Sequence, residues 1–137
     1  MDRRIRHARR HARLAFGDLD GDGAPDLVLS TFRGRVLVYS NGWKDTRRLT
    51  LRLVGRQPHN REAIGAVATL LSGGLRQTRQ VRAGSSYLSC SSKDLYFGLG
   101  ASAEADSIEI RWPDGTRQRR EHVPAGLVVW RQAEGAP

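Results

Sequence analysis

The residues best suited to chemistry form an acidic loop, Asp18 to Asp26, in an otherwise basic chain. Its carboxylates alternate with other residues, and two glycines allow the sharp turns that bring these side chains to one centre. Hard oxygen ligands at this density suit Ca²⁺, which takes about six to eight oxygens in a flexible geometry. We therefore predict one Ca²⁺ site, formed by four side chains and one backbone carbonyl: Asp18, Asp20, Asp22, the carbonyl of Ala24, and Asp26.

The alternative for this loop is a cluster of Asp and Gly turns that binds no metal. Repulsion among four carboxylates makes such a cluster costly without a cation, so the pattern favours the metal site. The spacing begins like an EF-hand loop but ends differently, because Leu29 stands where the bidentate Glu belongs. The segment that follows, residues 27–31, is typical of a strand rather than a helix.

A loop of this kind that leads into a strand resembles the calcium loops of FG-GAP repeats, and Phe16-Gly17 directly before Asp18 supports the resemblance. In that family the repeats form the blades of a β-propeller. Residues 14–40 supply at most part of one blade, whereas a propeller needs roughly four to eight. The resemblance implies that this chain is the C-terminal fragment of a longer protein.

The rest of the chain favours short strands. Residues 48–54 alternate leucines with polar side chains, and Ser72-Gly73-Gly74 predicts a hairpin between two further strands. Turn signals recur every eight to twelve residues, roughly, which indicates an all-β sandwich or barrel. Trp112 and Trp130 fall within strand segments and are expected to pack in the core.

Four motifs from residue 60 onward resemble the ASPIC/UnbV module of the cartilage acidic protein family. They occur in the family's order and span more than half of the chain: Asn60-Arg61-Glu62-Ala63-Ile64-Gly65-Ala66, Arg82-Ala83-Gly84-Ser85-Ser86-Tyr87-Leu88-Ser89, Tyr96-Phe97-Gly98-Leu99-Gly100, and Asp106 to Gly115. Cys90 departs from the family pattern, in which a polar residue is expected after Tyr-Leu-Ser.

Together these features predict an all-β chain: a partial β-propeller blade, from an FG-GAP repeat, followed by a small antiparallel β-sandwich, the ASPIC/UnbV module. The expected boundaries place a basic disordered arm first, then the partial repeat with its calcium loop, the module, and a short tail: residues 1–13, 14–47, 48–132 and 133–137.

The two resemblances imply a calcium-binding protein that is extracellular, periplasmic or located at the cell surface. They also imply that it is adhesive or matrix-like and not an enzyme. They imply further FG-GAP repeats upstream in full-length relatives and a protein or glycan partner of unknown identity. Two alternatives stay open. One is an accessory role in secondary-metabolite biosynthesis, because the bacterial name UnbV comes from a biosynthetic setting. The other is a basic, nucleic-acid-associated fragment.

A catalytic interpretation of the serine-rich segment finds little support. Ser85, Ser86 and Ser89 would need a base within hydrogen-bond reach, and no histidine lies in a recognisable motif. Cys90 is the single cysteine, so an intrachain disulfide is excluded, and no Cys/His motif accompanies it. We expect the segment to satisfy its own backbone rather than to act as a nucleophile.

The charge of the chain bears on the nucleic-acid alternative. The formal net charge is +9, and residues 1–13 alone contain six arginines and one aspartate. Such an arm neutralises phosphates non-specifically, but no nucleic-acid-binding motif accompanies it, and the acidic loop would repel a phosphate backbone. The arm lacks the apolar segment of a secretory signal, and the chain lacks a run of about 18 apolar residues that could span a membrane.

Overall fold

The computed structural model describes residues 11–31, 34–42, 47–85 and 88–133. The regular elements in these residues are β-strands, which confirms the all-β prediction. The strands are β1 (His11–Gly17), β2 (Asp26–Thr31), β3 (Val36–Tyr39), β4 (Arg47–Val54), β5 (Val67–Ser72), β6 (Leu75–Gln80), β7 (Leu95–Gly100), β8 (Glu104–Arg111), β9 (Arg117–Pro124) and β10 (Gly126–Arg131).

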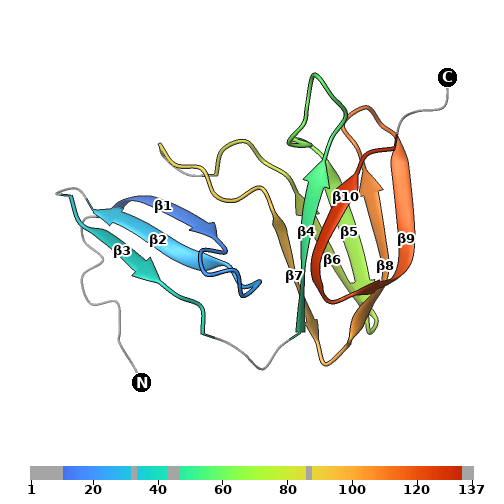
Figure 1. Ribbon diagram of the computed structural model, residues 1–137, viewed down its shortest axis with the longest axis horizontal. Helices are drawn as coiled ribbons and strands as arrows, with labels where there is room; N and C mark the ends of the chain where they lie inside the picture. The colour runs from blue at the N-terminus through green and yellow to red at the C-terminus, as the bar shows by residue number, and fades with distance from the viewer. Residues whose placement is uncertain (1–10, 32–33, 43–46, 86–87, 134–137) are drawn as a thin grey trace.

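The strands form three sheets, of which two stack face to face (Figure 1). One layer of this sandwich has the order β10-β4-β7, and the other has the order β6-β5-β8-β9. The third sheet, β1-β2-β3, is antiparallel and lies beside the sandwich, with the loop between β1 and β2 turned toward β7 (Figure 1). The predicted β-sandwich is therefore confirmed.

The last strand departs from the expected antiparallel pairing. β10 runs parallel to β4, in a register that places Gly126 opposite Leu49 and Arg131 opposite Val54. The chain leaves β9 in the other layer at Pro124 and enters β10 at Gly126, whose φ of 114° favours glycine. This crossing from one layer to the other delivers β10 to the edge of β4 in the parallel direction.

The core lies between the two layers of the sandwich. The alternation predicted for residues 48–54 is present in β4, whose three leucines point inward, and Trp112 and Trp130 are both buried, as expected. The small residues Ala63 and Ala66 are fully buried in the same core cluster. The buried residues of this cluster come from between positions 49 and 130, so the sandwich closes its core without the third sheet.

The acidic loop belongs to the three-stranded sheet. A propeller blade typically has four strands, so the assignment of this sheet as part of a blade stays a prediction. β1 begins at His11, which means that the last three residues of the expected arm belong to a strand; residues 1–10 lie outside the described residues. The structure thus corrects the C-terminal limit of the arm. No helix that could cross a membrane occurs in the part of the chain that is described.

Candidate metal centre

Three of the predicted ligands are brought together in the loop between β1 and β2. Each of Asp18, Asp20 and Asp22 offers a carboxylate oxygen, and these oxygens lie within 4.8 Å of one another. Two oxygens bound to one Ca²⁺ at about 2.3–2.6 Å can be no more than about 5 Å apart. The donor type and the spacing therefore both fit a calcium ion.

The loop is shaped by hydrogen bonds from its own backbone. Asp18 accepts from the N–H groups of Gly21 at 2.8 Å and Gly23 at 3.0 Å, one on each carboxylate oxygen. Asp20 and Asp22 each accept from the N–H two residues later, at 3.2 and 2.7 Å. The two glycines have φ of 78° and 84°, so a residue with a Cβ would be strained at either position. The carboxylates thereby converge on one side of a tight turn.

Asp26 has a different role from the other three aspartates. It is buried, with 3% of its surface exposed, and stands at the first position of β2. One carboxylate oxygen accepts from the N–H of Leu19 at 2.9 Å, and the other accepts from the N–H of Asn41 at 2.8 Å. These donors lower the pKa of Asp26, with the Asn41 bond as the largest cause. Asp26 thus closes the loop on itself and ties it to the segment after β3.

The fifth predicted ligand, Ala24, is almost fully buried at the end of the loop, and its N–H donates to Asp22. Its carbonyl is still a predicted ligand. The structure thus brings together three of the predicted side chains and places Asp26 and Ala24 at the base of the loop.

The sandwich holds the loop through residues that the sequence pattern did not assign to the site. Arg48 lies 3.5 Å from the carboxylate of Asp22, and the hydroxyl of Thr50 donates to the carbonyl of Gly23 at 3.2 Å. Both residues are in β4, on the polar face of its alternating pattern. The acidic loop covers this face at Thr50, which is only 4% exposed. The alternation indicated the face but gave no sign of what covers it.

A second connection runs through the segment between β6 and β7, which extends across to β1 (Figure 1). The N–H of Ser92 donates to the carbonyl of Phe16 at 2.8 Å, and the hydroxyl of Ser89 donates to the carbonyl of Leu14. The thiol of Cys90 donates to the carbonyl of Ala83 at 2.9 Å. The bonds of Ser92 and Ser89 fasten the segment to the first strand, and the bond of Cys90 holds the segment to itself. Ser86 lies outside the described residues.

The first motif, residues 60–66, builds a turn against the core. The side-chain amide of Asn60 donates to the carbonyl of Ile64 and accepts from its N–H, both at 2.9 Å. The N–H of Gly55 donates to the carbonyl of Arg61 at 2.9 Å, so the chain packs tightly at this point. The motif therefore specifies a compact loop of the sandwich.

The fold and these motifs define the class of protein. The family model described as "ASPIC and UnbV" matches residues 55–134, and the chain belongs to this family. The chain is also similar to cartilage acidic protein 1 of Mus musculus (38% identity), Homo sapiens (37%) and Xenopus tropicalis (36%). The three matches cover 72%, 72% and 74% of this chain, but only 16%, 15% and 16% of the respective relatives.

Proposed function

We propose that this chain is a non-catalytic, calcium-binding interaction module of an extracellular or surface-located adhesion protein. The observation that carries the proposal is the convergence of Asp18, Asp20 and Asp22, whose carboxylate oxygens lie within 4.8 Å of one another, close enough for one Ca²⁺ to contact all three. The family match and the likeness to cartilage acidic protein 1 support a matrix-type role. The matched region is a small part of those relatives, in which further repeats are expected upstream.

In this proposal the three converging aspartates bind Ca²⁺ through their side chains, with Asp26 and the carbonyl of Ala24 completing the protein ligands. The affinity is modest, because no bidentate Glu is present; extracellular calcium modules bind at roughly 10⁻⁴–10⁻³ M. At about millimolar calcium, mass action then stabilises the protein by only about 0.4–1.4 kcal/mol. Calcium is expected to order the loop and its contacts with β4 rather than to drive folding of the sandwich.

Isothermal titration of the full chain with calcium tests the proposal. Asp20→Ala removes one exposed carboxylate from the converging set, whereas the control Glu121→Ala removes an exposed carboxylate from β9. We expect wild type and the control to bind Ca²⁺ with a Kd of about 10⁻⁴–10⁻³ M, and Asp20→Ala to bind at least about tenfold more weakly. Mg²⁺ should compete poorly, because it requires octahedral geometry and gives up its water reluctantly.

Equal heats for wild type and Asp20→Ala, or no calcium-dependent heat at millimolar concentrations, would contradict the metal assignment and leave the loop as a cluster of turns. A loss of binding in Glu121→Ala equal to that in Asp20→Ala would show that the signal depends on overall charge.

A further inference from the structure

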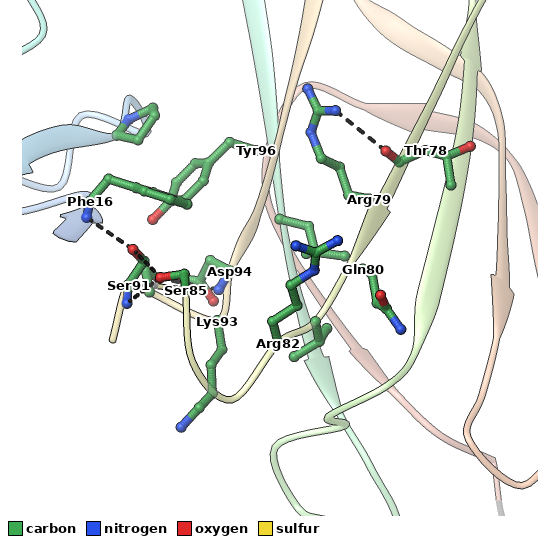
Figure 2. A pocket seen from close by; sticks show the side chains of 14 residues that line it. Phe16, Thr78, Arg79, Gln80, Arg82, Ser85, Ser91, Lys93, Asp94 and Tyr96 are labelled. Atoms are coloured by element: carbon green, nitrogen blue, oxygen red, sulfur yellow. Dashed lines mark hydrogen bonds between the residues drawn. The ribbon is translucent and has the colours of Figure 1, made fainter. Parts of the chain in front are cut away.

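A cleft of about 620 Å³ lies beside the acidic loop, between β1, the end of β6 and the start of β7. Its volume is in the range typical of small-molecule sites. Figure 2 shows two different walls. Arg79 and Arg82 project from β6 and the residues after it, and the opposite wall is formed by Phe16, Tyr96 and Ser91.

The charge of the cleft is positive. Its lining includes three cationic side chains and one carboxylate, Asp94. Asp94 is already engaged, because Arg52 donates to its two oxygens at 2.9 and 2.7 Å. Lys93 is likewise paired with Glu62. The two remaining arginines, Arg79 and Arg82, are therefore the cations available to an anionic ligand.

The two arginines differ in how they are held. The Cζ atom of Arg79 lies 5.9 Å from the centre of the Phe97 ring, and its guanidinium donates to the carbonyl of Thr78 at 3.3 Å. This anchoring leaves further guanidinium donors for a ligand, since the group has five. Arg82 is exposed, and within the described residues it has no carboxylate partner. Guanidinium groups suit planar recognition of carboxylate, sulfate or phosphate oxygens.

The opposite wall offers ring faces and hydroxyl groups. Phe16 and Tyr96 meet edge to face, with ring centres 6.4 Å apart and planes at 68°, and Phe16 is 39% exposed. Beside them the hydroxyl of Ser85 donates to that of Ser91 at 2.9 Å. This wall combines apolar area with hydrogen-bonding groups that can both donate and accept.

We propose that this cleft binds a sulfated or carboxylated saccharide. The acidic groups would contact Arg79 and Arg82, the sugar rings would lie against the aromatic pair, and the serine hydroxyls would bond the sugar hydroxyls. An acidic peptide would use the arginines but has less use for the aromatic and hydroxyl wall. The inference rests on the proposed interaction function and deepens it by naming a ligand class.

The cleft is also joined to the candidate calcium loop. Phe16 precedes Asp18 by two residues, and the N–H of Asp18 donates to the hydroxyl of Tyr96 at 3.2 Å. The aromatic wall is therefore built partly from the strand that leads into the loop. Calcium and saccharide binding nevertheless use different side chains, so each can be measured separately on the same protein.

The test is isothermal titration of the full chain with a heparin-derived tetrasaccharide. Arg79→Ser and Arg82→Ser each remove one positive charge from the cleft. Arg76→Ser is the matched control, because Arg76 is exposed on β6, as Arg79 is, but does not line the cleft. We expect each cleft variant to weaken binding about tenfold, as for the loss of one charge-assisted contact, and the control to weaken it less than about twofold. Thermal melting of each variant verifies that the fold is retained.

Three results would overturn the proposal: no tetrasaccharide binding at millimolar concentrations, an equal loss in Arg76→Ser, or an oligoglutamate peptide that binds as tightly with the same dependence on Arg82. The first two leave no specific saccharide site, and the third assigns the cleft to acidic peptides. Calcium titration on the same samples separates the outcomes, because a normal calcium heat without saccharide binding rejects this inference alone.

Discussion

Tyr96 of β7 accepts a hydrogen bond from the backbone N–H of Asp18, at 3.2 Å, and so connects the sandwich to the first residue of the acidic loop. The two residues are 78 positions apart in the chain. The same tyrosine packs edge to face against Phe16. A single side chain of the sandwich therefore contacts both the strand before the loop and the loop itself.

Tyr96→Phe should loosen the loop while leaving the sandwich folded. The substitution removes the acceptor for the Asp18 N–H but keeps the aromatic ring against Phe16, so we expect a loss of about 0.5–1.5 kcal/mol in the free energy of unfolding. Calcium affinity should fall a few-fold, because the loop is held less firmly. Urea denaturation and calcium titration measure the two effects. Tyr39→Phe, on the exposed side of β3, is the control; equal effects in both variants would contradict the role given to Tyr96.

The stability of the protein should decrease in acid because of Asp26. Its hydrogen bonds with Leu19 and Asn41 lower its pKa in the folded state below the unfolded value of about 3.9. The resulting stabilisation is complete above the unfolded pKa and is lost as the pH falls through the lower, folded pKa. Asp26→Asn should be less stable than wild type at pH 7, since the amide presents one oxygen where two N–H groups require acceptors, and should lose less stability on acidification.

Urea midpoints measured without calcium between pH 7 and 3 test this prediction. If wild type and Asp26→Asn lost equal stability over that range, the titrating group responsible would lie elsewhere. Because calcium is left out of the measurement, the pH dependence reports the hydrogen bonds of Asp26 within the loop.

Much of the sandwich could be predicted from local patterns. Alternation located β4, and the Ser72-Gly73-Gly74 turn located the hairpin of β5 and β6. The apolar segment before this turn begins at Ile64, but β5 begins at Val67. Positive φ values at Ala63 and Gly65 keep the backbone out of the strand conformation before that point. The packing of the turn sets this conformation. An alanine gives no sequence signal for a positive φ, so the conformation of Ala63 could not be predicted.

Long-range features escaped prediction for a common reason. The sequence of β1 gives no clear strand pattern, because the segment begins among arginines. In the structure its two large apolar side chains, Leu14 and Phe16, are exposed, so residues 13–17 of β1 form no buried face. It is a strand because β2 pairs with it. The parallel pairing of β10, likewise, depends on a partner more than seventy residues away in sequence. Periodicity shows which face of a strand is polar, but the partner that covers the face or the edge is determined by the whole fold.

The spacing of the acidic loop correctly predicted that Asp18, Asp20 and Asp22 converge, because alternation within a tight turn is a local property. It gave no sign that Asp26 accepts from Asn41, fifteen residues later. Whether the converging group binds Ca²⁺ stays a prediction for the titration described above.

Gly55→Ala should destabilise the sandwich through a backbone collision. A Cβ at this position would lie 2.1 Å from the carbonyl oxygen of Asn60, in the turn that carries the first family motif. The turn would have to shift, and we expect a loss of about 1–3 kcal/mol, as for overpacking in a core. The control is Gly84→Ala, where a Cβ meets no atom within 4 Å and the change should stay within about 0.5 kcal/mol. Equal urea midpoints for the two variants would show that the turn yields without cost.

The sandwich should fold without the three-stranded sheet, and β10 should be essential to it. A fragment of residues 47–133 contains the full buried cluster and both layers of the sandwich. We therefore expect protected amides in β4, β5 and β8 by hydrogen exchange. The fragment 11–42 contains only the three-stranded sheet, and Val36 and Val38 of β3 are 63% and 58% exposed. This sheet has too little buried apolar surface to form a core, so its amides should show little protection from exchange.

The matched control is a fragment of residues 47–125, which lacks β10. It loses the parallel partner of β4 and the buried Trp130, which packs in the core. The centre of the Trp130 ring lies 4.1 Å from the guanidinium carbon of Arg120. Removing a fully buried aromatic residue costs about 3–5 kcal/mol, a large part of the stability of a domain of this size. We expect this fragment to lose amide protection throughout. Protection in 47–125 equal to that in 47–133 would mean that β10 is an accessory edge strand, and absent protection in 47–133 would mean that the sandwich depends on the β1–β3 sheet.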